Sequence, residues 1–282
     1  MAEYWKGAPV AQAMTERLAV RADQLKGLGI VPTLAIVRVG ERPEDLSYER
    51  GAVKRCEKVG IRVKQFTLPK ESSHGDLLAV IQQINADREI HGCLLFRPLP
   101  PQMDEAAICA ALDPAKDVDG ITAGSLAGVF TGSGVGYPPC TAQACMEILD
   151  YYGCDLAGKR AVVVGRSLVV GKPLAMLLLG KNATVTLCHT RTADLASECR
   201  RAEVLIAAAG HAKMIGRDHL APGQLVLDVG INVDQEGNLV GDVDFAAAEE
   251  LAAAVTPVPG GVGAVTTSVL ADHVIQAAYD MR

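Results

Sequence analysis

The sequence has few aromatic residues and no excess of positive charge. Aromatic residues make up 4% of the 282 residues, and only one residue is tryptophan. This scarcity, together with abundant Ala, Val, Leu and Gly, favours helices packed closely on a parallel sheet over a β-sandwich. The net charge of −6 gives no electrostatic case for nucleic acid or an anionic membrane as a partner. Hydrophobic residues at 49%, against 21% charged residues, are typical of a globular protein.

Several local patterns are also missing. No apolar run reaches about 18 residues, the length that a membrane-spanning helix needs. The first ten residues, MAEYWKGAPV, lack the basic and then apolar order of a signal peptide, so we expect a cytoplasmic protein. The six histidines form no H-x-x-x-H pair, and we predict no protein-bound metal. The eight cysteines form no C-x-x-C pair, and we expect them to be reduced and mostly buried.

The first half of the chain alternates between strand and helix patterns. Apolar, β-branched runs alternate with longer segments that end in glycine or proline. This order predicts a parallel sheet with crossover helices. The expected elements are a strand at 33–40, a helix at 43–59, a strand at 61–68, a helix at 73–86, a strand at 91–96 and a helix at 104–112.

The second half predicts another α/β unit. Residues 122–139 are rich in Gly, Ser, Thr and Pro, and we interpret them as a connection between domains, not as a phosphate loop. A helix at 141–151 precedes strands that recur with helices between them, which indicates a doubly wound unit. These strands are expected at 161–165, 183–189, 204–210 and 225–231. We therefore predict a two-domain α/β protein, with domains at 1–138 and 139–265 and a final helix, 266–282, that packs back on the first domain.

A glycine turn between a strand and a helix is the strongest local motif of the second half. The apolar run 161–164 leads directly into Gly165-Arg166-Ser167, and Gly171 precedes the next helix. The N-terminus of a helix offers free N–H groups and a partial positive charge to a diphosphate. Gly165 allows a sharp turn, and Gly171 allows the helix and strand to pack closely. The spacing is not G-x-G-x-x-G, so the prediction of a dinucleotide site depends on the position of the turn in a βαβ unit.

The end of the next strand favours NADP over NAD. NAD sites usually place an acidic residue there to accept a hydrogen bond from the ribose 2′-hydroxyl. Here the chain reads His189-Thr190-Arg191, with no acid until Asp194. Arg166, Arg191 and the Thr190 hydroxyl suit a 2′-phosphate instead. The alternative is that these are ordinary solvated loop residues.

Seven segments, taken together and in order, resemble the methylenetetrahydrofolate dehydrogenase/cyclohydrolase family. They are KDVDG at 116–120, PCT at 139–141, VVVGRSLVVGKP at 162–173, NATVTLCH at 182–189, DVGIN at 228–232, GDV at 241–243 and TPVPGGVG at 256–263. The resemblance covers nearly the whole chain. It implies a folate-binding N-terminal domain and a Rossmann-like, NADP-binding C-terminal domain. It also implies a homodimer that acts on tetrahydrofolate derivatives in one-carbon metabolism and purine biosynthesis.

The resemblance further implies the residues of the site. Tyr48 and Asp119 would be catalytic, with Tyr48 stacked near the folate ring and Asp119 hydrogen-bonded to the pterin. Without the family, Tyr48 could be a core aromatic and Asp119 a turn cap. The other folate contacts would be Leu95, Phe96, Arg97, Pro259, Gly260, Gly261, Val262 and Gly263, and the NADP contacts would be Gly165, Arg166, Ser167, Thr190, Arg191 and Ile231. The implied reaction, hydride transfer from the methylene bridge to the nicotinamide, needs orientation more than a protein base.

Two positions depart from the family pattern. Cyclohydrolase action in the family needs a lysine four residues after the tyrosine and a glutamine just before the Pro-Leu turn. Here these positions are Ala52 and Phe96. Lys54 lies roughly 120° around a helix from Tyr48, and Arg55 stays protonated and cannot act as a base. We therefore predict an NADP-dependent dehydrogenase with weak or absent cyclohydrolase activity.

Three other interpretations stay open. The chain could be a fully bifunctional enzyme in which another group carries out the hydrolysis. It could also be a two-domain NADP oxidoreductase that acts on a small carbonyl compound. From a different class, it could be a sensor that binds a dinucleotide without turnover. Reduction of NADP on addition of methylenetetrahydrofolate separates the enzyme from the sensor.

Overall fold

The computed structural model describes all of residues 1–282 and divides the chain into two compact units. The amino-terminal unit comprises residues 13–140 and 267–282, and the carboxyl-terminal unit comprises residues 1–12 and 141–266. Residues 1–12, which are predicted above for the first domain, belong to the carboxyl-terminal unit instead. Strand β1 (Glu3–Tyr4) pairs in parallel with β11 (Ala254–Val255), so the start of the chain joins the second sheet.

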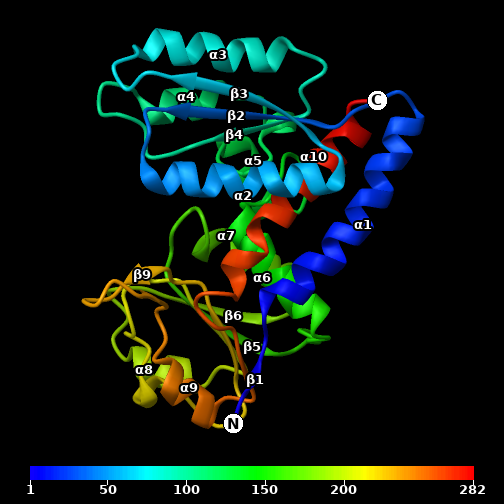
Figure 1. Ribbon diagram of the computed structural model, residues 1–282. Helices are drawn as coiled ribbons and strands as arrows, with labels where there is room; N and C mark the ends of the chain where they lie inside the picture. The colour runs from blue at the N-terminus through cyan, green and yellow to red at the C-terminus, as the bar shows by residue number, and fades with distance from the viewer. The chain divides into compact units, whose positions relative to one another are not determined.

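The amino-terminal unit is built on a three-stranded parallel sheet in the order β3-β2-β4. Every residue of the central strand β2 is buried, which agrees with its mainly apolar sequence, and the one charged residue, Arg38, pairs with Glu49 at 2.9 Å. Helices α2 and α3 lie on opposite sides of this sheet (Figure 1). The elements are β2 (Thr33–Val39), α2 (Pro43–Val59), β3 (Arg62–Leu68), α3 (His74–Ala86), β4 (Gly92–Leu95) and α4 (Glu105–Ala111).

The residues predicted to end α2 and to begin α3 have these positions in the structure. Gly60 ends α2 in the left-handed conformation with φ 78°. Ser73 and Asp76 form a capping box at the start of α3, where each side chain accepts a hydrogen bond from the backbone N–H of the other. The unit also contains most of α1 (Gly7–Gly27) and of α10 (Thr266–Asp280).

Residues 122–139 are not a plain linker, and on this segment the sequence analysis was wrong. Thr122 caps a helix, α5 (Ala123–Thr131), and Gly132 ends it with φ 66°. The chain then folds back on the helix so closely that a Cβ on Gly128 would lie 1.9 Å from the carbonyl oxygen of Val135. Small residues therefore permit close packing here, although their composition resembles that of a loop.

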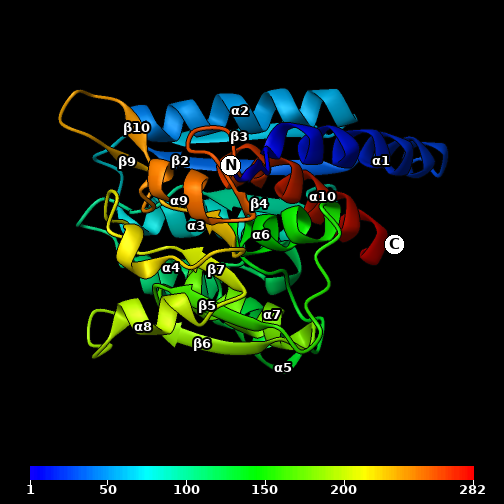
Figure 2. The same ribbon diagram turned by 90° about the horizontal axis from the view of Figure 1, so that it is seen from below.

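The carboxyl-terminal unit contains a six-stranded parallel sheet in the order β1-β11-β8-β7-β5-β6. Strand β5 pairs with both β6 and β7, so the chain changes direction across the sheet beside β5 (Figure 2). Such a switch point is where open α/β sheets bind ligands. The remaining elements are α6 (Cys140–Tyr151), β5 (Arg160–Val164), α7 (Gly171–Gly180), β6 (Thr184–Cys188), α8 (Leu195–Arg200), β7 (Val204–Ala207), β8 (Leu225–Asp228), β9 (Asn232–Val233), β10 (Leu239–Val240) and α9 (Phe245–Leu251).

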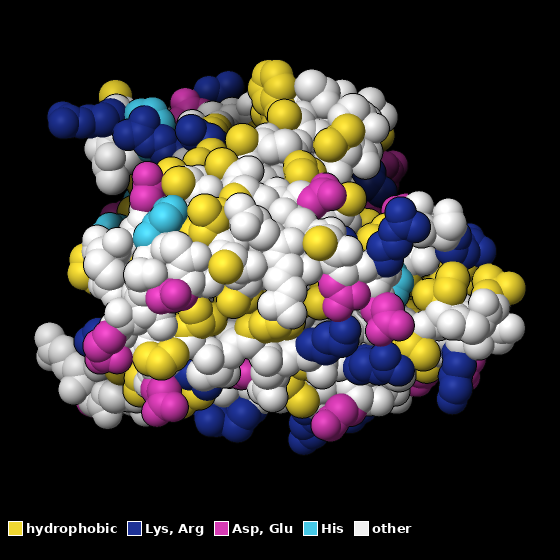
Figure 3. Space-filling model, turned by 90° about the horizontal axis from the view of Figure 1, so that it is seen from above, with side chains coloured by type: hydrophobic (Ala, Val, Ile, Leu, Met, Phe, Trp, Pro, Cys, Tyr) yellow, Lys and Arg dark blue, Asp and Glu magenta, His cyan; other side chains and the backbone are white.

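Charged side chains of both signs lie on the surface, and most cysteines are buried. Acidic, basic and hydrophobic side chains are interspersed on the face drawn in Figure 3. Seven cysteines are buried, Cys154 is half-buried, and all eight are free. None of the helices has the length and apolar character needed to cross a membrane.

Candidate active site

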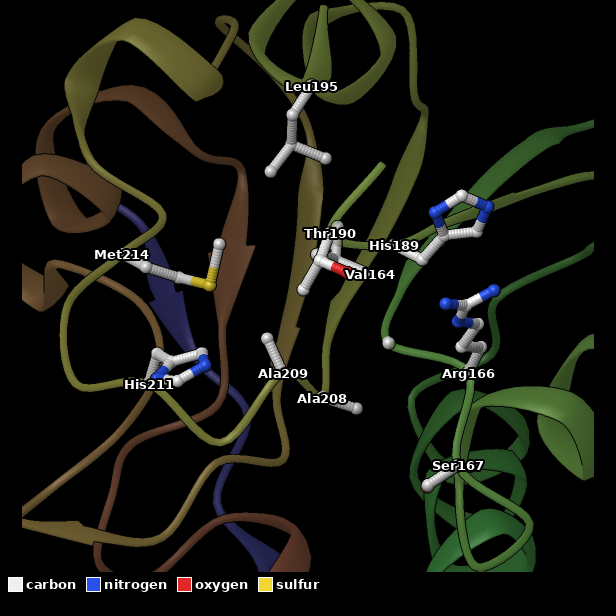
Figure 4. Close-up of a pocket in the computed structure, with 11 residues that line it drawn as sticks. Val164, Arg166, Ser167, His189, Thr190, Leu195, Ala208, Ala209, His211 and Met214 are labelled. Carbon is white, nitrogen blue, oxygen red and sulfur yellow. The ribbon is translucent and has the colours of Figure 1, made fainter. Parts of the chain in front are cut away.

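A pocket of about 220 Å³ lies at the carboxyl ends of β5, β6 and β7. Arg166 and His189 stand on one side of it, and His211 and Met214 on the opposite side (Figure 4). The pocket thus occupies the switch point of the sheet. The residues that line it are Val164, Gly165, Arg166, Ser167, His189, Thr190, Leu195, Ala208, Ala209, His211 and Met214.

Two glycines shape the turn from β5 to α7, and one of them, Gly165, lines this pocket. Gly165 has φ +124°, and a Cβ there would lie 2.0 Å from the carbonyl oxygen of Ala208. A Cβ on Gly171 would lie 1.9 Å from the carbonyl oxygen of Gly165. Both distances are far inside van der Waals contact, so only glycine fits at either position. The resulting cradle lets a diphosphate approach the backbone closely.

The start of helix α7 suits an anion. Its N-cap residue, Val170, provides no side-chain cap for the first turn. Ser167 Oγ accepts a hydrogen bond from the Val170 N–H at 3.1 Å and shapes the approach to the helix. The Lys172 N–H already donates to the carbonyl oxygen of Ser167 at 3.1 Å and Pro173 has no N–H, so the first turn offers an anion the Gly171 N–H and the partial positive charge of the helix end.

Not every predicted NADP contact lies in this pocket. The Arg191 side chain is not part of its lining, although the Arg191 N–H donates to His189 Nδ1 at 3.0 Å. Ile231 is 66% exposed and lines a second pocket, at the carboxyl end of β8. Gly165, Arg166, Ser167 and Thr190 line this pocket, Ile231 lines the second one and Arg191 lines neither, and all six stay predicted NADP contacts.

The second pocket has a volume of about 270 Å³ and unites Ile231 with the predicted folate loop, residues 259–263. Within this loop, Gly261 packs tightly against the preceding residues, since a Cβ there would lie 2.6 Å from the carbonyl oxygen of Pro257. Gly260 adopts φ +105°, which favours glycine. Both pockets lie along the carboxyl edge of one sheet, because β8 and β7 are neighbours.

In the amino-terminal unit, two charged residues of the KDVDG segment, Lys116 and Asp117, make hydrogen bonds that hold the surrounding backbone. Lys116 Nζ donates to the carbonyl oxygens of residues 84, 85 and 87 at 2.7–3.0 Å. Asp117 is buried and accepts hydrogen bonds from the Ile121 N–H, the Thr122 N–H and the Ser125 hydroxyl. Asp117 is therefore a loop cap.

Asp119 has a different environment. Its side chain is half-buried, and burial raises the pKa of Asp119 to about 6, against hydrogen bonds from Cys140 that lower it. The Cys140 thiol, which has a single hydrogen, also lies 3.3 Å from the carbonyl oxygen of Val118. His273 Nδ1 lies 2.8 Å from the same oxygen, so two side chains hold the backbone next to Asp119.

Tyr48 and Phe96 form an aromatic pair. Their ring centroids are 6.0 Å apart, and the rings meet edge to face at 82°. Ala52, one turn after Tyr48 on α2, is fully buried. Phe96 thus contributes a hydrophobic ring to this region, and Ala52 contributes only a methyl group.

The neighbouring basic residues have other partners. Lys54 lines a separate pocket together with Arg50 and Glu57, and this pocket includes neither Tyr48 nor Phe96. Arg55 donates a hydrogen bond to Thr15 Oγ1 on α1. Arg97 lies 3.5 Å from Glu105, and the Leu95 side chain packs in the core of the unit.

The fold and these pockets define a two-domain α/β protein with a Rossmann-like dinucleotide-binding unit. Residues 5–119 match the model of the tetrahydrofolate dehydrogenase/cyclohydrolase catalytic domain, and residues 139–282 match the NAD(P)-binding domain of the same family. The chain belongs to the tetrahydrofolate dehydrogenase/cyclohydrolase family.

Known relatives match along the whole chain. The Bifunctional protein FolD of Carboxydothermus hydrogenoformans is 51% identical over 279 residues, which cover 98% of this chain and 97% of that protein. The crystal structure of the bifunctional methylenetetrahydrofolate dehydrogenase/cyclohydrolase FolD from Campylobacter jejuni superposes with a TM-score of 0.96, at 35% identity and with 99% of each chain covered. The corresponding Trypanosoma brucei enzyme, solved with NADP cofactor and an inhibitor, gives a TM-score of 0.92 at 32% identity, over 99% of this chain and 98% of that one.

Proposed function

We propose that this protein oxidises 5,10-methylenetetrahydrofolate to 5,10-methenyltetrahydrofolate with NADP as the oxidant. Family membership and the pocket at the switch point of the NAD(P)-binding domain support this activity. Bound NADP supplies the hydride acceptor. We further propose that the protein acts as a cytoplasmic homodimer whose folate and NADP domains divide near residue 139.

We propose the following roles for the residues of the site. The backbone at Gly165 and the start of α7 bind the diphosphate, and Arg166 with Thr190 binds the 2′-phosphate. Tyr48 and Asp119 orient the pterin, while the loop 259–263 lies along the folate. Because the methenyl cation is stabilised by the folate nitrogens, these residues accelerate the step by orientation.

We also propose that cyclohydrolase activity is weak or absent. The observation that carries this proposal is the contact of Phe96 with Tyr48 beside the buried Ala52. Hydrolysis of the methenyl group needs an activated water, and a positioned general acid–base contributes about 10²–10⁴-fold. A phenyl ring and a methyl group supply neither a donor nor an acceptor. The second candidate is the bifunctional enzyme, favoured by the name of the relative at 51% identity.

A paired steady-state assay tests both parts. We expect NADPH and methenyltetrahydrofolate to form in equal amounts, with methenyltetrahydrofolate disappearing at nearly the rate seen without enzyme. Rapid enzyme-dependent loss of methenyltetrahydrofolate would establish the bifunctional alternative. Absence of NADPH formation would refute the dehydrogenase itself. The same assay with NAD measures the preference between the two nucleotides.

A further inference from the structure

Asp242, which follows the β9–β10 hairpin, is fully buried in the carboxyl-terminal unit and binds four donors. Its Oδ2 accepts hydrogen bonds from the N–H groups of Ala209 at 2.6 Å and Gly210 at 2.9 Å. Its Oδ1 accepts from the His211 N–H at 2.9 Å and from Asn232 Nδ2 at 2.9 Å. One carboxylate thus fixes three successive backbone amides after β7 and one side chain after β8.

Two of these three amides belong to residues that line the proposed dinucleotide pocket. Ala209 and His211 line it, and the loop that they form begins where the hydrogen bonding of β7 ends. Successive N–H groups that converge on one point form an anion-binding nest. Here the protein's own carboxylate fills the nest, so the conformation of the loop depends on Asp242.

A second carboxylate holds Asp242 in place. Asp228, the last residue of β8, accepts hydrogen bonds from the N–H groups of Asp242 at 2.9 Å and Val243 at 2.9 Å, and from the Gly230 N–H at 3.1 Å. Gly241 is required for this approach, because a Cβ there would lie 1.8 Å from Asp228 Oδ2. A Cβ on Gly230 would likewise lie 2.2 Å from Asp242 Oδ1.

Asp228 and Asp242 together connect the two pockets at the carboxyl ends of the strands. Asp228 and Gly230 line the pocket that contains Ile231, whereas Asp242 holds the floor of the pocket that contains Gly165. Neither carboxylate has spare room for a ligand of its own, since seven donors already surround the two groups. Their role is therefore to shape the pockets.

We propose that Asp242 is a positioning residue for dinucleotide binding, which fixes the loop 208–211 and couples it to the loop after β8. The proposal rests on the assignment of this unit as the NAD(P)-binding domain. In an Asp242→Asn variant, an NH₂ group replaces one of the two carboxylate oxygens and faces backbone N–H donors. Two donors that face each other cannot form a hydrogen bond, so the loop has to rearrange.

The test is the dissociation constant for NADP measured by calorimetry on the full chain, which needs no catalysis. For Asp242→Asn we expect NADP binding to weaken by about tenfold or more, which corresponds to about 1.4 kcal/mol. In the coupled assay the KM for NADP should rise in parallel, while the KM for methylenetetrahydrofolate stays within about twofold. Gly230→Ala, which crowds the same carboxylate from the other side, should weaken NADP binding in calorimetry by a similar factor and serves where Asp242→Asn does not accumulate. Its KM for methylenetetrahydrofolate is not part of this comparison, because Gly230 lines the pocket of the loop 259–263.

Two controls separate positioning from general stability. Asp244→Asn alters the N-cap of α9 two residues away, and since Asn caps as well as Asp, NADP binding should not change. Leu205→Ala lowers the melting temperature through the core of the same sheet without touching the loop. If Asp242→Asn and Gly230→Ala lose stability as Leu205→Ala does but keep wild-type affinity for NADP, the proposal is overturned. A wild type that binds NADP but reduces none would refute the proposed function and leave this inference standing.

Discussion

At the scale of single residues, Asp119 has a carboxyl group that ionises close to neutral pH. Burial raises its pKa to about 6, so the carboxylate form predominates only above that pH. The ionised form is the stronger acceptor for the N–H groups of a pterin. We expect kcat/KM for methylenetetrahydrofolate to fall as the pH decreases through about 6, and the Asp119→Asn variant to be low at every pH. A pH profile of wild type and variant, at saturating NADP, measures this.

The raised pKa of Asp119 also leads to a prediction for the stability of the Asp119→Asn variant. A carboxyl whose pKa is raised on folding binds more protons in the folded state, so its contribution to stability falls as pH rises from about 4 to 6. Asp119→Asn should therefore unfold at the same temperature as wild type, or higher, at pH 7.5. A wild-type profile that is flat down to pH 5 would contradict the assignment of Asp119, as would a variant inactive only because it is unfolded.

Single residues also show where prediction from sequence stops. Asp117 and Asp119 are both aspartates, so the sequence does not distinguish their roles. The burial of Asp117 and its three hydrogen-bond donors identify it as a loop cap. Which pocket a loop side chain lines cannot be obtained from strand order: Ile231, a contact that only the family resemblance implies, lines the pocket of residues 259–263, and Arg191 lines neither pocket. Asp242 was noted only within the GDV segment, because its four donors are backbone or distant groups without a local pattern.

At the scale of elements, the turn from β5 to α7 depends on two glycines. We expect Gly165→Ala and Gly171→Ala each to abolish measurable NADP binding, because their Cβ atoms would lie 2.0 and 1.9 Å from backbone oxygens that have no room to move. Gly180→Ala is the matched control on the same helix, with nothing within 4 Å of its Cβ. It should bind NADP normally and gain up to about 1 kcal/mol of stability. Normal NADP binding by either of the first two variants would exclude this turn as the diphosphate site.

The elements themselves were largely predictable. The strands β2, β5, β7 and β8 consist mainly of apolar residues, and α2 and α3 carry explicit stop or start residues, so their type follows from local sequence. Helix α1 was not assigned, although Val10, Met14, Leu18, Ala22 and Leu25 recur at helical spacing and are buried. Strand β1 could not be found, since its two exposed residues become a strand only by pairing with β11, about 250 residues away. Tertiary pairing decides such short elements.

At the scale of the molecule, the division into two compact units predicts where a nucleotide stabilises the chain. The NADP pocket belongs wholly to the carboxyl-terminal unit. A ligand that binds only the folded state adds about 2.7 kcal/mol of stability at a hundred times its dissociation constant, or about 5–10 °C in melting temperature for a unit of this size. We expect NADP to slow amide hydrogen exchange most at residues 165–171 and 208–211. The Asp242→Asn variant at equal saturation should show less protection at 208–211 than at 165–171, because its loop has lost one of the acceptors that fix it. Protection confined to residues 13–140 would place the nucleotide in the other unit and contradict both the site and the positioning role of Asp242.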